Sequence, residues 1–372
     1  MLGKPDDMTF WQRLSQLVRT EWYHLTDFKH SDRPWQLPFA AALASGLPLA
    51  VGAWFGHVQY GVLSSLGGLV FLYIANLPLA QRMVVLMVCA FAMAASFGLA
   101  QMGSALHPLA TPVVLTFLTL LVGMVTRFYR LPPPGSFFFI MVASIGAYLP
   151  VNVELIPLRV GLVFMGSMLA LLMAFFYSLW MMPRLPPPQP APSPHYDFQY
   201  VVYDSVLIAV FVGLALVVAE LMGLRSAYWA PVSCIAIMQN VTMRAVWNKQ
   251  VHRILGTAAG MVLTWLLLTL QLNPWSLFLI LTTLSFIIEM LVVRHYGLAV
   301  IFITPLTILL AEAGANMQLP PDVIIQARLI DIVVGSVIGV VGGVFLHNLT
   351  LREWVSRHLF RRPMPPTQRH QA

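Results

Sequence analysis

The chain has 372 residues, of which 59% are hydrophobic and only 9% are charged. A soluble domain has about a quarter of its residues charged, so this composition excludes a soluble globular protein and indicates an integral membrane protein. The net charge of +7 does not require nucleic acid as a partner, because basic segments beside an anionic inner leaflet are usual in membrane proteins.

The N-terminal segment, residues 1–34, is polar and carries several acidic residues, which is atypical of a cleavable signal peptide. We expect this segment to be cytoplasmic. Within residues 8–30, apolar side chains recur at helical spacing and predict an amphipathic helix that lies along the inner membrane interface. These side chains are Trp11, Leu14, Val18, Trp22 and Leu25.

Two hydrophobic regions follow, residues 35–183 and 198–348. Both contain apolar runs near the roughly 17 to 25 residues of a spanning helix. In the first region the runs are 36–56, 60–79, 83–103, 108–126, 135–151 and 160–181. In the second they are 201–221, 227–243, 252–272, 275–293, 296–313 and 324–347. We therefore predict an all-α integral membrane protein of about twelve transmembrane helices, six in each region.

The remaining segments and the distribution of basic residues predict the orientation. Residues 184–197 are proline-rich and predict a stiff cytoplasmic linker, and residues 349–372 form a basic tail. With the N-terminus inside, 18 of the 21 Lys and Arg residues lie on cytoplasmic segments. This asymmetry is typical of a multi-pass protein, and it places both termini in the cytoplasm.

The two hydrophobic regions repeat a set of landmarks in the same order. In the first region these are Arg82, His107-Pro108, Arg127-Phe128-Tyr129, Arg159, Gly166-Ser167 and Phe176. In the second they are Arg253, Asn273-Pro274, Arg294-His295-Tyr296, Arg328, Gly335-Ser336 and Phe345. Six is an even number of spans, so both halves enter the membrane from the same side. The pattern predicts two parallel six-helix repeats around a pseudo-twofold axis along the membrane normal.

The densest polar chemistry lies in the second half. Tyr228-Trp229-Ala230-Pro231 opens an apolar segment that ends at Gln239-Asn240, and Arg244, Lys249 and Arg253 precede Gly256-Thr257. We expect Arg253 to begin a helix, where the free amides and the helix dipole favour an anion. The alternative interpretation is ordinary positive-inside topology beside a small-residue packing face.

These residues resemble a known family. The Tyr-Trp-Ala-Pro segment and Arg-Ile-Leu-Gly-Thr-Ala-Ala-Gly, from Arg253 to Gly260, are similar to the fusaric acid resistance and aromatic acid exporter family, to which plant aluminium-activated malate transporters are distantly related. The likeness covers about residues 35–350, with its motif confined to 228–260. Larger exporters carry a cytoplasmic domain after each hydrophobic block, and the first half here reads Arg82-Met83-Val84, without the Gly-Thr motif.

The resemblance implies export of small, often aromatic, organic acids across a bacterial inner membrane, commonly driven by protons and often with a periplasmic adaptor protein. Arg253 and Arg82 would supply cations for the acid, and Tyr228 and Trp229 flat partners for its ring. The interfacial aromatic belt is the alternative role for these two rings. The remaining candidate substrate-binding residues are Gln239, Asn240 and Thr257.

Two acidic residues interrupt apolar runs and are candidates for proton coupling, Glu289 and Asp331. Each costs about 2.5 to 3.5 kcal/mol at the bilayer centre on insertion scales, so an acid there is a functional candidate. Asp331 has a structural alternative, because Arg328 lies one helical turn away. Glu289 has no such neighbour, so its partner would come from another helix, with Arg253 and Arg294 as the options.

The sequence contains no motif for metal binding, phosphate binding or catalysis. The histidines lack metal-ligand spacing and no phosphate-binding glycine loop is present, so we expect no metal, no cofactor and no enzymatic activity. Cys89 and Cys234 lie in apolar runs, which is atypical of a disulfide. Besides an exporter, two functions stay open: a passive organic-anion channel, and a membrane subunit of a larger envelope export complex. A homodimer is also compatible with the sequence.

Overall fold

A computed structural model describes residues 28, 30–31, 33–107, 109–184, 198–239, 243–270, 272–314 and 320–359. Nearly all of the predicted amphipathic helix of residues 8–30 and of the predicted linker lies outside the described residues, as does Asn240.

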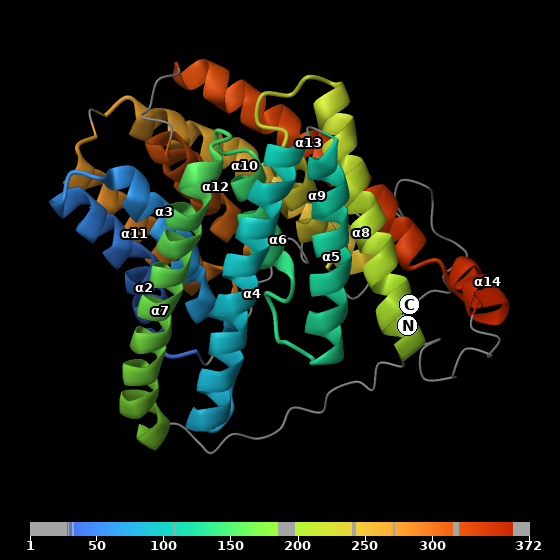
Figure 1. The fold of residues 1–372 in the computed structure, drawn as a ribbon, viewed down its shortest axis with the longest axis horizontal. Coiled ribbons are helices and arrows are strands. Elements are labelled where there is room, and N and C mark those ends of the chain that lie inside the picture. Colours follow the sequence, from blue (N-terminus) through green and yellow to red (C-terminus); the bar gives the residue numbers. More distant parts are fainter. Residues whose placement is uncertain are drawn as a thin grey trace, which may run out of the picture.

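The described residues fold into α-helices and short 3-10 turns (Figure 1). The first half contains α2 (Gln36–Trp54), α3 (Val58–Gly68), η2 (Leu69–Tyr73), α4 (Leu79–Leu106), α5 (Ala110–Phe128), α6 (Phe137–Ala147), η3 (Val153–Leu155), α7 (Ile156–Met181) and η4 (Met182–Arg184). The second half contains α8 (Phe198–Leu221), α9 (Trp229–Met238), α10 (Met243–Leu268), α11 (Pro274–Leu291), α12 (Tyr296–Gly314), α13 (Pro321–Leu346) and α14 (Leu349–Leu359).

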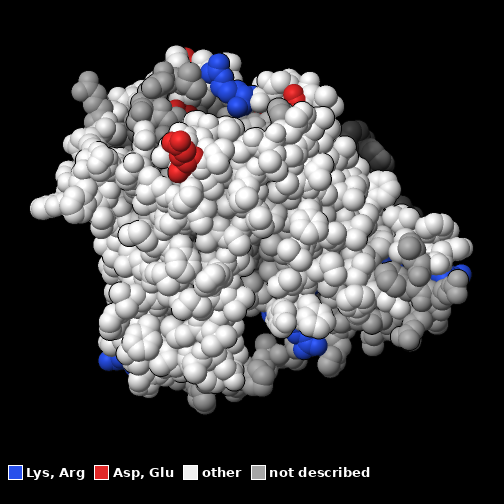
Figure 2. Space-filling view, in the orientation of Figure 1, with Lys and Arg blue, Asp and Glu red and all other residues white. Residues whose placement is uncertain are grey.

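Within the described ranges, 9 helices are long and apolar enough to cross a membrane. Large hydrophobic side chains are exposed on their outer faces, among them Phe91, Leu172 and Trp265. Figure 2 shows a broad belt without charged side chains between two ends that carry them. Apolar faces of this kind are stable against lipid, which confirms the predicted all-α, multi-pass membrane protein.

Three further apolar helices are shorter than the sequence suggested: Val58–Tyr73, Phe137–Ala147 and Trp229–Met238. At 1.5 Å rise per residue a ten-residue helix is about 15 Å long, half the roughly 30 Å of the hydrocarbon core. Backbone that ends inside a membrane must be covered by protein. All 10 residues of α9 are buried, so its neighbours supply that cover.

Corresponding helices of the two halves pack in corresponding pairs (Figure 1). Within the halves, α3 packs on α7 as α9 packs on α13, and α4 packs on α6 as α10 packs on α12. Between the halves, α5 packs on α8 and α11 packs on α2. Each half thus places its short second helix against its last helix.

Two of the repeated landmarks make equivalent contacts in these pairs. A Cβ added at Gly166 in α7 would overlap the backbone oxygen of Ser64 in α3, and one added at Gly335 in α13 would overlap that of Ala230 in α9. Glycine is required at both positions because it lets a helix approach the backbone of the short helix.

Gly166→Ala and Gly335→Ala are each expected to destabilise the protein by about 1–3 kcal/mol, because the obstacle is backbone and cannot move aside as a side chain would. The thermal midpoint of the purified protein in detergent measures this loss. Gly161→Ala in α7 is the matched control, since no atom lies within 4 Å of its added Cβ. Equal midpoints for Gly161→Ala and Gly335→Ala would contradict the close packing.

Candidate functional site

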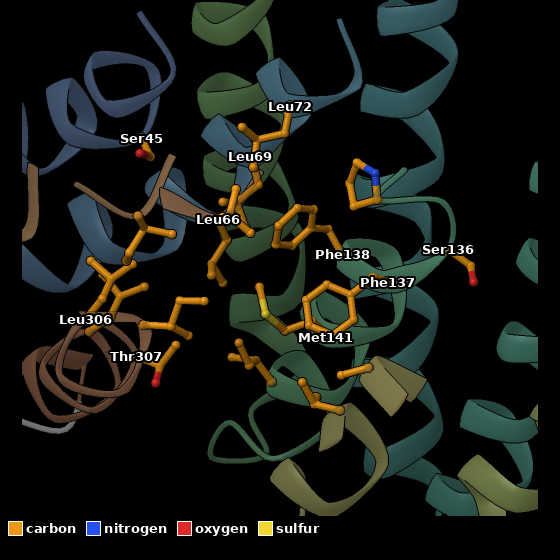
Figure 3. A pocket seen from close by; sticks show the side chains of 18 of the residues that line it. Ser45, Leu66, Leu69, Leu72, Ser136, Phe137, Phe138, Met141, Leu306 and Thr307 are labelled. Atoms are coloured by element: carbon orange, nitrogen blue, oxygen red, sulfur yellow. The ribbon is translucent and has the colours of Figure 1, made fainter. Parts of the chain in front are cut away.

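A cavity of about 1640 Å³ lies between the two halves. Its walls come from α2, α3, η2, α5, α6 and α7 of the first half and from α8 to α13 of the second. Figure 3 shows part of the apolar wall, where side chains of η2, α6 and α12 face a common space. They include Leu69, Leu72, Phe137, Phe138, Met141 and Leu306.

The charged residues that line the cavity are mostly basic. The cations are Arg33, Arg127, Arg130, Arg159, Lys249, Arg253 and Arg328. The acids are Asp204 and Glu289. Cations surrounded by low-dielectric walls raise the local concentration of anions. The cavity therefore combines apolar surface with a positive field, which suits an anion that has an apolar body.

Arg253 projects from α10 toward two neighbouring helices. Its Nη2 donates to the Ser233 hydroxyl at 2.9 Å, and its Nη1 donates to the Tyr296 hydroxyl at 3.4 Å. One turn earlier on α10, Lys249 places its ammonium 5.1 Å from the centre of the Tyr296 ring. Two cations thus converge where α9, α10 and α12 meet.

The expected helix start at Arg253 is wrong. Helix α10 begins at Met243, so Arg253 lies well inside it. The intervening residues contain no Gly or Pro to end a helix, and the backbone amides at Arg253 are bonded within α10 rather than free. Positive potential at this position therefore comes from the side chains of Arg253 and Lys249.

Aromatic rings form a row at another part of the wall. The ring centres of Tyr148 and Tyr228 are 5.6 Å apart, and those of Tyr228 and Trp229 are 5.2 Å apart. The Arg328 guanidinium lies over the Trp229 ring, 3.1 Å from its centre. Tyr228, Trp229 and Thr257, all predicted from the sequence, line the cavity together with Arg253.

Gln239 joins the two halves beside the cavity. Its side-chain amide lies 2.7 Å from the Ser136 hydroxyl. In the orientation that suits its neighbours, its oxygen accepts from the Phe137 N–H and its nitrogen donates to the Pro134 carbonyl. Gln239 thus provides a hydrogen-bond partner for a backbone N–H at the start of α6, which has none within the helix. This contact gives Gln239 a structural role at the cavity wall.

Arg82 is not among the residues that line the cavity. Its side chain is buried between α4 and α7, where Nη1 donates to the Ser178 hydroxyl at 2.9 Å. The structure therefore does not bring Arg82 together with Arg253.

The two predicted acids occupy different environments. Glu289 in α11 lines the cavity and lies 3.6 Å from Arg33, rather than beside Arg253 or Arg294. Asp331 in α13 is fully buried, and neither of its carboxylate oxygens has a hydrogen-bond partner. The expected pairing of Asp331 with Arg328 is absent from the ion pairs of the described residues, because the Arg328 guanidinium turns instead to Trp229 and Thr307.

Part of the second half matches a known sequence family. Residues 214–342 match the model for fusaric acid resistance protein-like sequences. This region is similar to fusaric acid resistance protein-like sequences. It includes α9 to α12 and most of α13, and so it contains Trp229, Arg253, Glu289 and Arg328.

The chain is also similar to a curated membrane protein. The chain is 30% identical over 151 residues to an uncharacterized membrane protein, YvaC, of Bacillus subtilis (strain 168). The match covers 40% of this chain and 23% of YvaC, so the chain spans about a quarter of that relative's length. No solved structure matches the chain at a significant level.

A buried charge cluster next to the cavity lies outside the fusaric acid resistance protein-like region and was not predicted. Asp204 in α8 pairs with Arg352 of α14 at 2.8 Å and with Arg127 of α5 at 4.0 Å. Asp204 is 4% exposed, and both Asp204 and Arg127 line the cavity. The sequence signal was an aspartate inside the apolar run 201–221, which is rare unless the acid is paired.

Proposed function

We propose that the protein is an inner-membrane transporter that exports small organic acids, in particular aromatic carboxylates. The observation that carries this proposal is the cavity of about 1640 Å³ between the two halves, with its excess of cations and its apolar, aromatic walls. Pockets that hold one small molecule have volumes of about 300–1,000 Å³. A larger space between membrane helices suits a path through which a substrate moves.

The matching helix pairs support two parallel six-helix repeats around a pseudo-twofold axis, with the cavity between them. In this arrangement Arg82, Arg127 and Arg253 lie toward the cytoplasm and Arg159 lies toward the outside, with both termini cytoplasmic. A periplasmic adaptor and a homodimer remain predictions, and co-purification with cross-linking in cells tests both.

Proton coupling is proposed for Glu289, because it is an acid at the cavity wall whose partner, Arg33, is on another segment. Glu289 can take up and release a proton at the cavity wall, so binding of a proton and binding of the substrate can alternate there. Asp331 is proposed as a second acid in this process, since it is buried without a hydrogen-bond partner.

A passive anion channel is the alternative, favoured by the extent of the cavity. Its lining includes Arg127, at the C-terminal end of α5, and Arg159, near the N-terminal end of α7. In the proposed orientation these two residues lie on opposite sides of the membrane. Anion currents through the purified protein in planar bilayers that persist in Glu289→Gln would favour the channel over the proton-coupled exporter.

Uptake of labelled benzoate or fusaric acid into inverted membrane vesicles tests the exporter. Vesicles that contain the protein are expected to accumulate the acid when respiration energises them, and an uncoupler is expected to remove the accumulation. Vesicles without the protein measure passive diffusion of the neutral acid. Uptake that is equal with and without the protein would contradict the proposal.

A further inference from the structure

Arg328 is a buried cation with free hydrogen-bonding capacity at the cavity wall. Its side chain is only 5% exposed and it lines the cavity. Nη2 donates to the Thr307 hydroxyl at 2.8 Å, while Nε and Nη1 have no hydrogen-bond partner. A buried charge is costly unless it is paired and hydrogen-bonded. Trp229 offers the guanidinium a ring face, but no acceptor for these two nitrogens.

Among the described residues, no acidic side chain forms an ion pair with Arg328. Asp331 is on the same helix, one turn away, yet its carboxylate accepts no hydrogen bond and makes no ion pair among the described residues. Glu312 of α12 also leaves Oε2 without a partner. The cation at Arg328 is therefore available to an anion that enters the cavity.

Arg328 and Arg253 contact successive turns of the same helix. Arg328 lies over Trp229, whereas Arg253 binds Ser233. These two residues of α9 are four positions apart, so they lie on one face, separated along the helix by about 6 Å. A carboxylate could therefore pass from one cation to the other along this face of α9.

We propose that Arg328 is a second carboxylate-binding site, the outer of two along α9, with Arg253 as the inner one. The ligand class is an aromatic carboxylate, whose acid group accepts hydrogen bonds from Arg328 while its ring packs on Tyr228 and Tyr148. This inference rests on the proposed function, because it assigns a second binding site on the same transport path.

Photolabelling with 4-azidobenzoate, followed by peptide mapping of the purified full chain, tests the proposal. Wild-type protein is expected to be labelled near Arg328, on peptides with Tyr228, Trp229 or Thr307, and near Arg253, on the peptide with Tyr296. In Arg328→Gln, labelling near Thr307 should fall by about tenfold, as expected for the loss of one charge-assisted hydrogen bond, while labelling near Tyr296 persists.

Four further results decide the matter. Arg225→Gln removes an exposed cation outside the cavity and should leave both labelled regions unchanged. Labelling near Thr307 that survives in Arg328→Gln would overturn the second site, yet leave the proposed function intact if Tyr296 is still labelled. If Arg328→Gln loses labelling at both places, Arg328→Lys decides: label restored near Thr307 supports the site, and its absence contradicts it. Wild-type protein that takes no label would count against the proposed function itself.

Discussion

Arg253→Ala is expected to raise the substrate concentration for half-maximal transport of an aromatic carboxylate by roughly 10- to 100-fold. The guanidinium is held toward the cavity by Ser233 of α9 and Tyr296 of α12, so it is positioned before a substrate arrives. A hydrogen bond to a charged group contributes about 1.5–3 kcal/mol, and each 1.4 kcal/mol is tenfold in affinity. Initial rates of labelled benzoate uptake into vesicles measure the change.

Arg244→Ala is the matched control for this prediction. It removes the same charge from the same helix, but Arg244 is exposed and does not line the cavity. Uptake by this variant should match that of the wild type. If Arg253→Ala and Arg244→Ala behave alike, Arg253 acts only through the overall positive charge of the cytoplasmic face.

Glu289→Gln is expected to abolish the dependence of uptake on the proton gradient. An exporter that exchanges one proton for each substrate accumulates it by about tenfold per pH unit, because one pH unit is 1.36 kcal/mol. Glutamine cannot release a proton, so the accumulation ratio should fall to about one while exchange down the gradient continues. Uptake into proteoliposomes at imposed pH gradients measures this ratio.

Two variants separate proton coupling from the ion pair with Arg33. Arg33→Ala breaks the 3.6 Å contact but leaves Glu289 able to titrate, so gradient-driven accumulation should persist. Glu154→Gln, at an exposed position outside the cavity, should behave as the wild type. Loss of accumulation in Arg33→Ala equal to that in Glu289→Gln would assign Glu289 a structural role instead.

Composition and helix-length hydrophobic runs were sufficient to predict the membrane class and the positions of most helices. The family motif at Tyr228–Pro231 and Arg253–Gly260 correctly indicated the fusaric acid resistance protein-like region, and four of its residues line one cavity: Tyr228, Trp229, Arg253 and Thr257. Glu289 also lines it. These predictions succeeded because a polar or aromatic group inside an apolar run is itself a local signal.

Features that depend on contacts between distant helices could not be predicted. Arg328 lies inside the predicted run 324–347, in agreement with α13, but its contacts with Trp229 and Thr307 were not predicted. The partner of Glu289, the Asp204–Arg352 pair and the role of Gln239 all join segments far apart in the sequence. The spacing of apolar and polar residues along the chain does not indicate such pairings.

Selectivity of transport for organic anions tests the central claim most directly. Proteoliposomes with the purified protein, at about pH 8 where a carboxylic acid is ionised, are expected to take up labelled benzoate faster than protein-free liposomes do. Unlabelled aromatic carboxylates should inhibit this uptake, and benzylamine, a cation of similar size, should not. Uptake no faster than in protein-free liposomes, or equal inhibition by benzylamine, would contradict a cavity that selects aromatic anions.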